Sequence, residues 1–155
     1  MAETGFEGLE ELDSFTESML KLANDELPKE SRKFIKKQAN QLKTATKNKA
    51  ESLGIIDQTG NYYSHFRSGK VYKYHGALSC RVYNTASAKN DRGAWMSLSA
   101  MLENGHLQTN KDRKSVGKGF VPGFHPFLRA YEDFMSKYYN NCEQFVDDMI
   151  NKHGL

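Results

Sequence analysis

The last part of the chain carries the pattern that most constrains the fold. From Pro126 to about Lys152, apolar residues recur three or four positions apart, a spacing that places them on one face of an α-helix. Pro126 suits the first turn of such a helix, where the N–H that proline lacks is not needed. We predict that this helix is the main packing element, with these residues on its inward side: Phe127, Ala130, Tyr131, Phe134, Tyr138, Phe145, Met149 and Ile150.

The beginning of the chain predicts two more helices. Apolar residues at helical spacing run from Leu9 to Leu22, and Pro28 suits the start of a second helix that ends at Gly54. The second helix is long, basic and only weakly amphipathic. Because such a helix is not stable alone, it must lie on a sheet, on the first helix or against a neighbouring subunit.

The middle of the chain favours short elements. Residues 57–66 predict a loop with aromatic anchors, and residues 70–74 and 78–83 predict a β-hairpin around Gly76 and Ala77. Residues 84–91 predict a polar loop, and the spacing from Trp95 to Leu102 predicts a helix that ends at Asn104 and Gly105. Residues 106–125 show no periodic pattern and predict a long loop.

The chain is lean in apolar residues for its size. Its 155 residues suit one folded unit, 1–155, with a helical part at 1–54 and the remaining elements at 62–155. Hydrophobic residues make up 38% of it and the mean hydropathy is -0.73, below the roughly 45–50% of an ordinary globular domain. Aromatic residues supply much of the apolar surface. We therefore expect a thin core that oligomerisation completes.

Charge is divided between two adjacent segments. Residues 3–26 hold eight acidic residues against Lys21, and residues 29–49 hold eight basic residues against Glu30. The two segments can attract each other within one chain or across a subunit boundary, or they can be two solvated helix faces. The overall charge of +3 does not by itself indicate nucleic-acid binding.

No pattern indicates catalysis, a metal site or a cofactor. The histidines and the two cysteines, Cys80 and Cys142, lack the paired spacing of zinc ligands, and no serine lies in a nucleophile elbow. We expect two buried free thiols in a reducing cytosol. The sequence also has neither a signal-peptide pattern nor an apolar run long enough for a membrane span, so we expect assembly in the cytoplasm without a membrane partner.

Two groups of polar residues have competing interpretations. Glu103 and His106 have the residue types of an acid/base pair. The favoured interpretation is a structural corner, in which Gly105 reverses the chain, Glu103 accepts backbone or arginine donors and His106 fixes the following loop. The basic residues of that loop could contact phosphates, remain solvated, or order against an acidic neighbour: Lys111, Arg113, Lys114 and Lys118.

Two blocks of the sequence are similar to a known family. Residues 99–106 (SAMLENGH), followed after the basic loop by residues 120–128 (FVPGFHPFL), resemble the neck proteins of tailed bacteriophages. These are the minor tail components called tail-completion or head-tail joining proteins. Residues 69–72, 81–84 and 6–12 are similar to further segments of the family, whereas residues 95–97 and the longer stretch 86–92 depart from it.

The resemblance implies a fold and a role. The fold is α+β, with long N-terminal helices and a C-terminal helix packed on a small antiparallel sheet. The role is structural, in the virion: copies form a ring, expected to be sixfold, between the tail tube or tail-terminator protein and the head connector, close to packaged DNA. The residues that carry the family motif are Glu103, Gly105, His106, Val121, Pro122, Gly123 and Phe127.

The charge division suggests how a ring would close. A ring needs a heterologous interface, and an acidic patch that meets a basic patch on the next subunit fits that geometry. Reversal of Lys33, Lys36 and Lys37 to glutamate should then change the oligomer.

A small nucleic-acid-binding module is the competing interpretation. It would use the basic helix 29–49 together with Tyr72, Tyr74 and Tyr83 as a stacking face. The neighbouring acidic helix opposes it, because its carboxylates repel phosphates.

Overall fold

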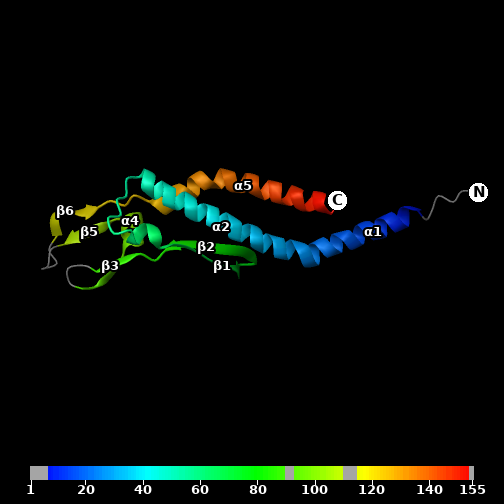
Figure 1. Cartoon of the computed structure of the whole chain (residues 1–155), viewed down its shortest axis with the longest axis horizontal. Helices are drawn as coiled ribbons and strands as arrows, with labels where there is room; N and C mark the ends of the chain where they lie inside the picture. The colour runs from blue at the N-terminus through cyan, green and yellow to red at the C-terminus, as the bar shows by residue number, and fades with distance from the viewer. Residues whose placement is uncertain (1–6, 90–92, 110–114, 154–155) are drawn as a thin grey trace, which may run out of the picture.

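The N-terminal third of the molecule is a nearly continuous helical rod. The computed structural model describes residues 7–89, 93–109 and 115–153. Helix α1 (Glu7–Lys21) runs through a π-helical turn, η1 (Leu22–Glu26), into α2 (Leu27–Ser52), as Figure 1 shows. The two separate helices expected from the sequence are therefore joined. Pro28 lacks the N–H of a regular helical turn, and the wider π-turn lies directly before it, where the Leu27 N–H bonds to the Leu22 carbonyl.

Helix α5 (Pro126–Lys152) lies antiparallel beside α2 (Figure 1), with the bounds that the sequence predicted. The rings of Phe34 and Phe145 stack at 4.6 Å between centroids, and the Asn141 amide donates to Gln38 Oε1 at 2.9 Å. Two residues predicted to face inward are instead exposed, Tyr131 and Ile150. The prediction was wrong there because α5 packs along a narrower stripe than its apolar pattern covers.

The predicted hairpin is confirmed. Strands β1 (Phe66–Tyr74) and β2 (Ala77–Asn84) pair antiparallel, with a bulge between Ser68 and Val71, and lie along α2 (Figure 1). Leu78 and Cys80 of β2 face the helices. Both cysteines are free but only half-buried, so the expectation of buried thiols was wrong. Cys80 lies at the margin of the contact between the hairpin and the helices.

The segments predicted as loops contain short elements. Helix α3 (Asn61–Ser64) and strand β3 (Ser87–Lys89) occupy two of them, and β5 (His106–Thr109) pairs with β6 (Ser115–Val121) in the segment predicted as one long loop. The sequences of these segments lack the alternating apolar residues from which a strand is predicted.

The helix predicted from Trp95 starts later than expected. Residues Trp95–Ser97 form strand β4, which pairs with β3, and α4 spans Leu98–Asn104. The Ser97 hydroxyl accepts a hydrogen bond from the Ala100 N–H at 3.3 Å and so caps the N-terminus of α4.

The fold is α+β, with the long helices packed on small antiparallel two-stranded sheets. The strands make three such sheets in the described part of the chain, rather than the one sheet expected. The main core cluster is small and contains Ala50, Ile55, Tyr62, Phe66 and Ala86, with Phe127 packed against it. The thin core expected from the composition is confirmed.

Candidate assembly surfaces

The two family-like blocks meet at one corner of the molecule. Glu103, near the end of α4, accepts hydrogen bonds from the first free N–H groups of α5: Oε2 from Phe127 at 2.9 Å and Oε1 from Leu128 at 3.0 Å. A carboxylate at a helix N-terminus satisfies unpaired donors and faces the positive end of the helix dipole. Both Glu103 oxygens therefore hold α5 in place, as the structural interpretation of this residue expected.

Two glycines let the backbones of this corner approach closely. Gly105 ends α4 with a φ of 79°, and a Cβ there would lie 2.9 Å from the Gly123 nitrogen. A Cβ on Gly123 would lie 2.7 Å from the Gly105 nitrogen. Both distances are too short for a side chain, so each position requires glycine. His106 pairs with Val121 as the first residues of the β5–β6 ladder.

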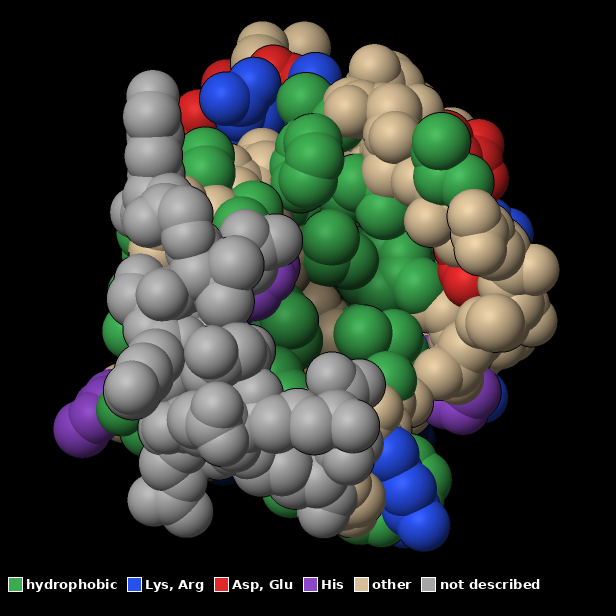
Figure 2. All heavy atoms as spheres, turned by 90° about the vertical axis from the view of Figure 1, so that its left-hand side faces the viewer, with side chains coloured by type: hydrophobic (Ala, Val, Ile, Leu, Met, Phe, Trp, Pro, Cys, Tyr) green, Lys and Arg blue, Asp and Glu red, His purple; other side chains and the backbone are tan. Residues whose placement is uncertain are grey.

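The corner borders a hollow at one end of the molecule. Figure 2 looks onto this end and shows hydrophobic side chains gathered around the hollow. Its volume is about 670 Å³, and its lining includes Ile56, Met101, Val121, Pro122 and Phe124. Ile56 is 84% exposed. An exposed apolar surface of this kind is typical of an interaction site. We name it the end hollow.

The wall of the end hollow includes a buried tyrosine. Tyr62 is 2% exposed, and its hydroxyl has no hydrogen-bond partner among the described residues. Burial raises its pKa above the ordinary value, and the neighbouring Tyr63 and Glu103 raise it further.

The three lysines predicted as assembly or DNA-facing residues differ in their surroundings. The Lys36 ammonium donates to the carbonyl oxygens of Ser68 at 2.9 Å and Gly69 at 2.6 Å, so it fixes the β1 bulge to α2. Lys33 pairs with Glu30 at 2.7 Å. Lys37 is exposed and has no ion-pair partner in the described ranges.

All three lysines line an open groove of about 1100 Å³ that α2 forms with α5. Its lining also includes Ala45 and the buried residues Ala130 and Phe134. We name it the α2–α5 groove. Its rim carries five lysines against one aspartate: Lys33, Lys36, Lys37, Lys49 and Lys137 against Asp133. Lys49 is ion-paired with that aspartate.

The basic residues of the predicted loop are not brought to this groove by any described contact. Lys111, Arg113 and Lys114 lie outside the described residues. Lys118 lies on β6, on the hairpin that replaces the predicted loop.

The tyrosines of the competing interpretation do share a face. Tyr72 and Tyr74 are two positions apart on β1 and therefore point to the same side of the hairpin. The pairing register puts Tyr83 of β2 on that side as well. All three are exposed, whereas Leu78 and Cys80 on the opposite side face the helices. The tyrosine face thus lies across the hairpin from α2, and α2 lysines do not extend it.

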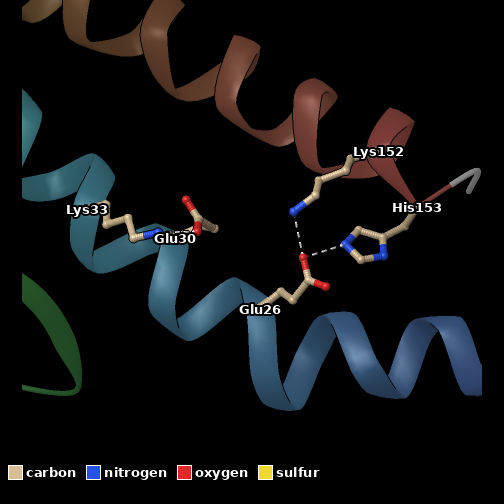
Figure 3. A network of polar contacts seen from close by, with 5 residues as sticks. All are labelled: Glu26, Glu30, Lys33, Lys152 and His153. Carbon is tan, nitrogen blue, oxygen red and sulfur yellow. Dashed lines mark hydrogen bonds and ion pairs between the residues drawn. The ribbon is translucent and has the colours of Figure 1, made fainter.

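A polar cluster that the sequence analysis missed ties the end of α5 to the end of η1, directly before α2. Glu26 Oε2 accepts from the Lys152 ammonium at 2.8 Å and lies 3.2 Å from His153 Nε2 (Figure 3). The hydrogen bond from Lys152 is the main cause that lowers the pKa of Glu26, and it raises the pKa of Lys152. The opposite charges of Glu26 and Lys152 were the only sign of this contact in the sequence. It became specific only once α2 and α5 were known to run antiparallel.

Neither metal-binding groups nor spanning helices are found in the described ranges. No group of three or more His, Cys, Asp or Glu residues there could hold a metal ion. The helices of the same ranges also lack the combination of length and apolar character needed to cross a bilayer.

Comparisons with family models, with curated proteins and with solved structures find no significant match to this chain.

Proposed function

We propose that this chain is a structural virion protein of the head-to-tail junction of a tailed bacteriophage, where copies assemble into a ring. The observation that carries the proposal is the corner at Glu103. Residues 107–119 separate the two blocks that resemble neck proteins, yet the Phe124 N–H donates to the Leu102 carbonyl at 2.7 Å and the Phe127 N–H donates to Glu103. The resemblance therefore concerns one three-dimensional element rather than two unrelated short strings.

The surface of the monomer supports an assembling role. The core is small, and large apolar side chains are exposed on α1, in the end hollow and along α5, among them Phe15, Ile56 and Tyr139. The described sheets have two strands each, so every strand keeps an open edge. A neighbouring subunit could cover these surfaces.

The proposed partners follow from the resemblance. One face of the ring would bind the tail tube or the tail-terminator protein, and the other would bind the head connector. The ring is expected to be hexameric, to assemble in the host cytoplasm and to remain in the virion near packaged DNA. No catalytic step is proposed, and both Glu103 oxygens are already hydrogen-bonded to the backbone of α5.

The test is the composition of purified particles. Quantitative mass spectrometry of virions should find the chain at a fixed low copy number, about six copies per virion, as one hexameric ring requires. Disruption of its gene should leave heads and tails unjoined or tails incomplete in electron micrographs. Absence of the chain from intact virions, or turnover of a substrate by the purified chain, would contradict the proposal.

Nucleic-acid binding is the second candidate, because Tyr72, Tyr74 and Tyr83 form one exposed face, beside Arg81 on the same side of β2. Aromatic side chains next to a basic residue can stack on unpaired bases. A gel-shift assay with single-stranded DNA at low salt tests it. A shift that triple alanine substitution of the tyrosines removes would support it, and no binding at low salt would contradict it.

A further inference from the structure

One side of α2 carries a row of basic side chains. The Lys36 ammonium on this side donates to the carbonyl oxygens of Ser68 and Gly69 on β1. Asn40 Oδ1 accepts a hydrogen bond from the Ser68 hydroxyl at 2.6 Å. Residues three, four or seven positions from Lys36 or Asn40 lie on the same side of the helix. With Lys36, they form what we name the α2 basic face: Lys29, Arg32, Lys33, Lys43 and Lys47.

Helix α5 packs on the other side of α2. The Phe34 ring stacks on Phe145, and Gln38 accepts from the Asn141 amide. With 3.6 residues per turn, Phe34 and Gln38 lie roughly opposite Lys36 on the helix. Helix α5 therefore leaves the α2 basic face uncovered, and each of its six side chains is exposed or half-buried.

The charge of this face is not neutralised by neighbouring carboxylates. Helix α2 carries eight basic residues and only two carboxylates, Glu30 and Glu51. Among the described residues, Lys33 is the one member of the face with an ion pair, to Glu30 at 2.7 Å. Residues 58–90, which include the hairpin beside α2, contain no aspartate or glutamate. The carboxylates of α1 lie beyond one end of the face, because η1 continues α1 almost in line with α2 (Figure 1).

The composition of the face matches phosphate better than a protein surface. Apart from Leu27 at its start, α2 exposes no large hydrophobic side chain. The centre of a protein–protein interface is usually apolar and poor in lysine, whereas lysine and arginine without apolar neighbours are typical of contacts to the nucleic-acid backbone. The face therefore suits a polyanion that it binds through charge.

The length of the face and its lack of a stacking surface favour duplex over single-stranded nucleic acid. From Lys29 to Lys47 the helix rises about 27 Å, at 1.5 Å per residue. A duplex carries one negative charge per about 1.7 Å of axis, so about 16 phosphate charges lie along that length. The tyrosines that would stack on unpaired bases, Tyr72, Tyr74 and Tyr83, lie on the side of the hairpin away from α2.

We propose that the α2 basic face binds the phosphate backbone of duplex DNA, independently of base sequence. This inference rests on the proposed function, since it specifies which surface a subunit of the junction would turn toward the DNA that passes it. Lys37, which lines the α2–α5 groove, is not part of this face.

The test is fluorescence anisotropy of a labelled random-sequence duplex, titrated with the full chain over a salt series. The natural chain should bind at low salt. With about five phosphate contacts, the logarithm of its binding constant should fall against the logarithm of the salt concentration with a slope of about -4 to -5. The face variant carries Lys29→Gln, Arg32→Gln and Lys43→Gln, three side chains without a hydrogen bond or ion pair among the described residues. It should bind at least about tenfold more weakly at low salt, and its slope should be smaller by about 2–3.

A second variant with the same loss of charge separates this face from the overall charge of the protein. It carries Lys37→Gln, Arg129→Gln and Lys137→Gln, three exposed positions on α5 and on the groove side of α2. It should bind duplex within about threefold of the natural chain, with nearly the same salt slope. Circular dichroism of both variants should match that of the natural chain, since every substituted side chain lies at the surface.

Three outcomes overturn the inference. The first is a natural chain that does not bind duplex at the lowest salt, and the second is an equal loss of binding in the two variants. The third is a preference for single-stranded DNA that alanine substitution of Tyr72, Tyr74 and Tyr83 removes while the face variant binds normally, which would place the contact on the hairpin. The copy number of the chain in virions is measured separately, so that loss of this contact and failure of the proposed function give different results.

Discussion

Removal of the Glu103 side chain should destabilise the protein through the start of α5. In Glu103→Ala, the N–H groups of Phe127 and Leu128 lose a charged acceptor. A hydrogen bond to a charged group contributes about 1.5–3 kcal/mol. Because Glu103 is only partly buried, water can replace some of this. Two such bonds and a helix-dipole contribution of about 0.3–1 kcal/mol sum to about 3–7 kcal/mol, and because water replaces part of this we expect a loss of about 2–4 kcal/mol. Glu103→Gln keeps one acceptor oxygen and should lose about half as much.

Urea denaturation followed by circular dichroism of the helices measures this loss. The control is Glu132→Gln, an exposed glutamate on α5, which should change the free energy of unfolding by less than about 0.5 kcal/mol. The expected order of stability is the natural chain and the control, then Glu103→Gln, then Glu103→Ala. If Glu103→Ala unfolds at the same urea concentration as the control, the corner does not hold α5 and the reasoning fails.

Three further predictions concern other contacts. Gly105→Ala should cost more than about 3 kcal/mol in urea denaturation, whereas Gly76→Ala, which has a similar positive φ but open space around it, should cost about 1 kcal/mol. Because the folded-state pKa of Glu26 is lowered, its contribution to stability is present at neutral pH and is lost as the pH falls below 4.5. Glu26→Gln should therefore be less stable than the natural chain at neutral pH, and the difference in free energy of unfolding between the two should shrink as the pH is lowered in a series of urea denaturations. Phe145→Ala should lower the free energy of unfolding by about 1–3 kcal/mol through loss of the stacked ring contact between the two long helices, and exposed Val146→Ala should change it by less than about 0.5 kcal/mol, both by thermal unfolding.

Elements with a periodic apolar pattern were predictable from the sequence. The bounds of α5 and the position of the β1–β2 hairpin follow from residue spacing and from the break at Gly76. The join between α1 and α2 was not predictable in the same way. Pro28 is a common first-turn residue, and the π-turn that carries the helix past it depends on backbone geometry that side-chain spacing does not encode.

The candidate surfaces were predictable only in part. The local sequence around Gly105 indicated a chain reversal, and the carboxylate of Glu103 suggested backbone donors, but the donors belong to Phe127 and Leu128. The role of Lys36 differs from that of Lys37 because one points at the β1 bulge and the other at solvent, a difference set by tertiary packing. Long-range contacts of this kind lie beyond composition and spacing.

Helix α5 is anchored at both of its ends, and this has a mechanical consequence. Its first turn is bound to Glu103 at one end of the molecule, and its last turn is bound to Glu26, at the end of η1 and directly before α2. The helix thus connects two distant regions of the molecule mechanically. A load applied through η1 would therefore be carried along the full length of α5 to Glu103, with the exposed Lys152–Glu26 pair as the weaker of the two attachments.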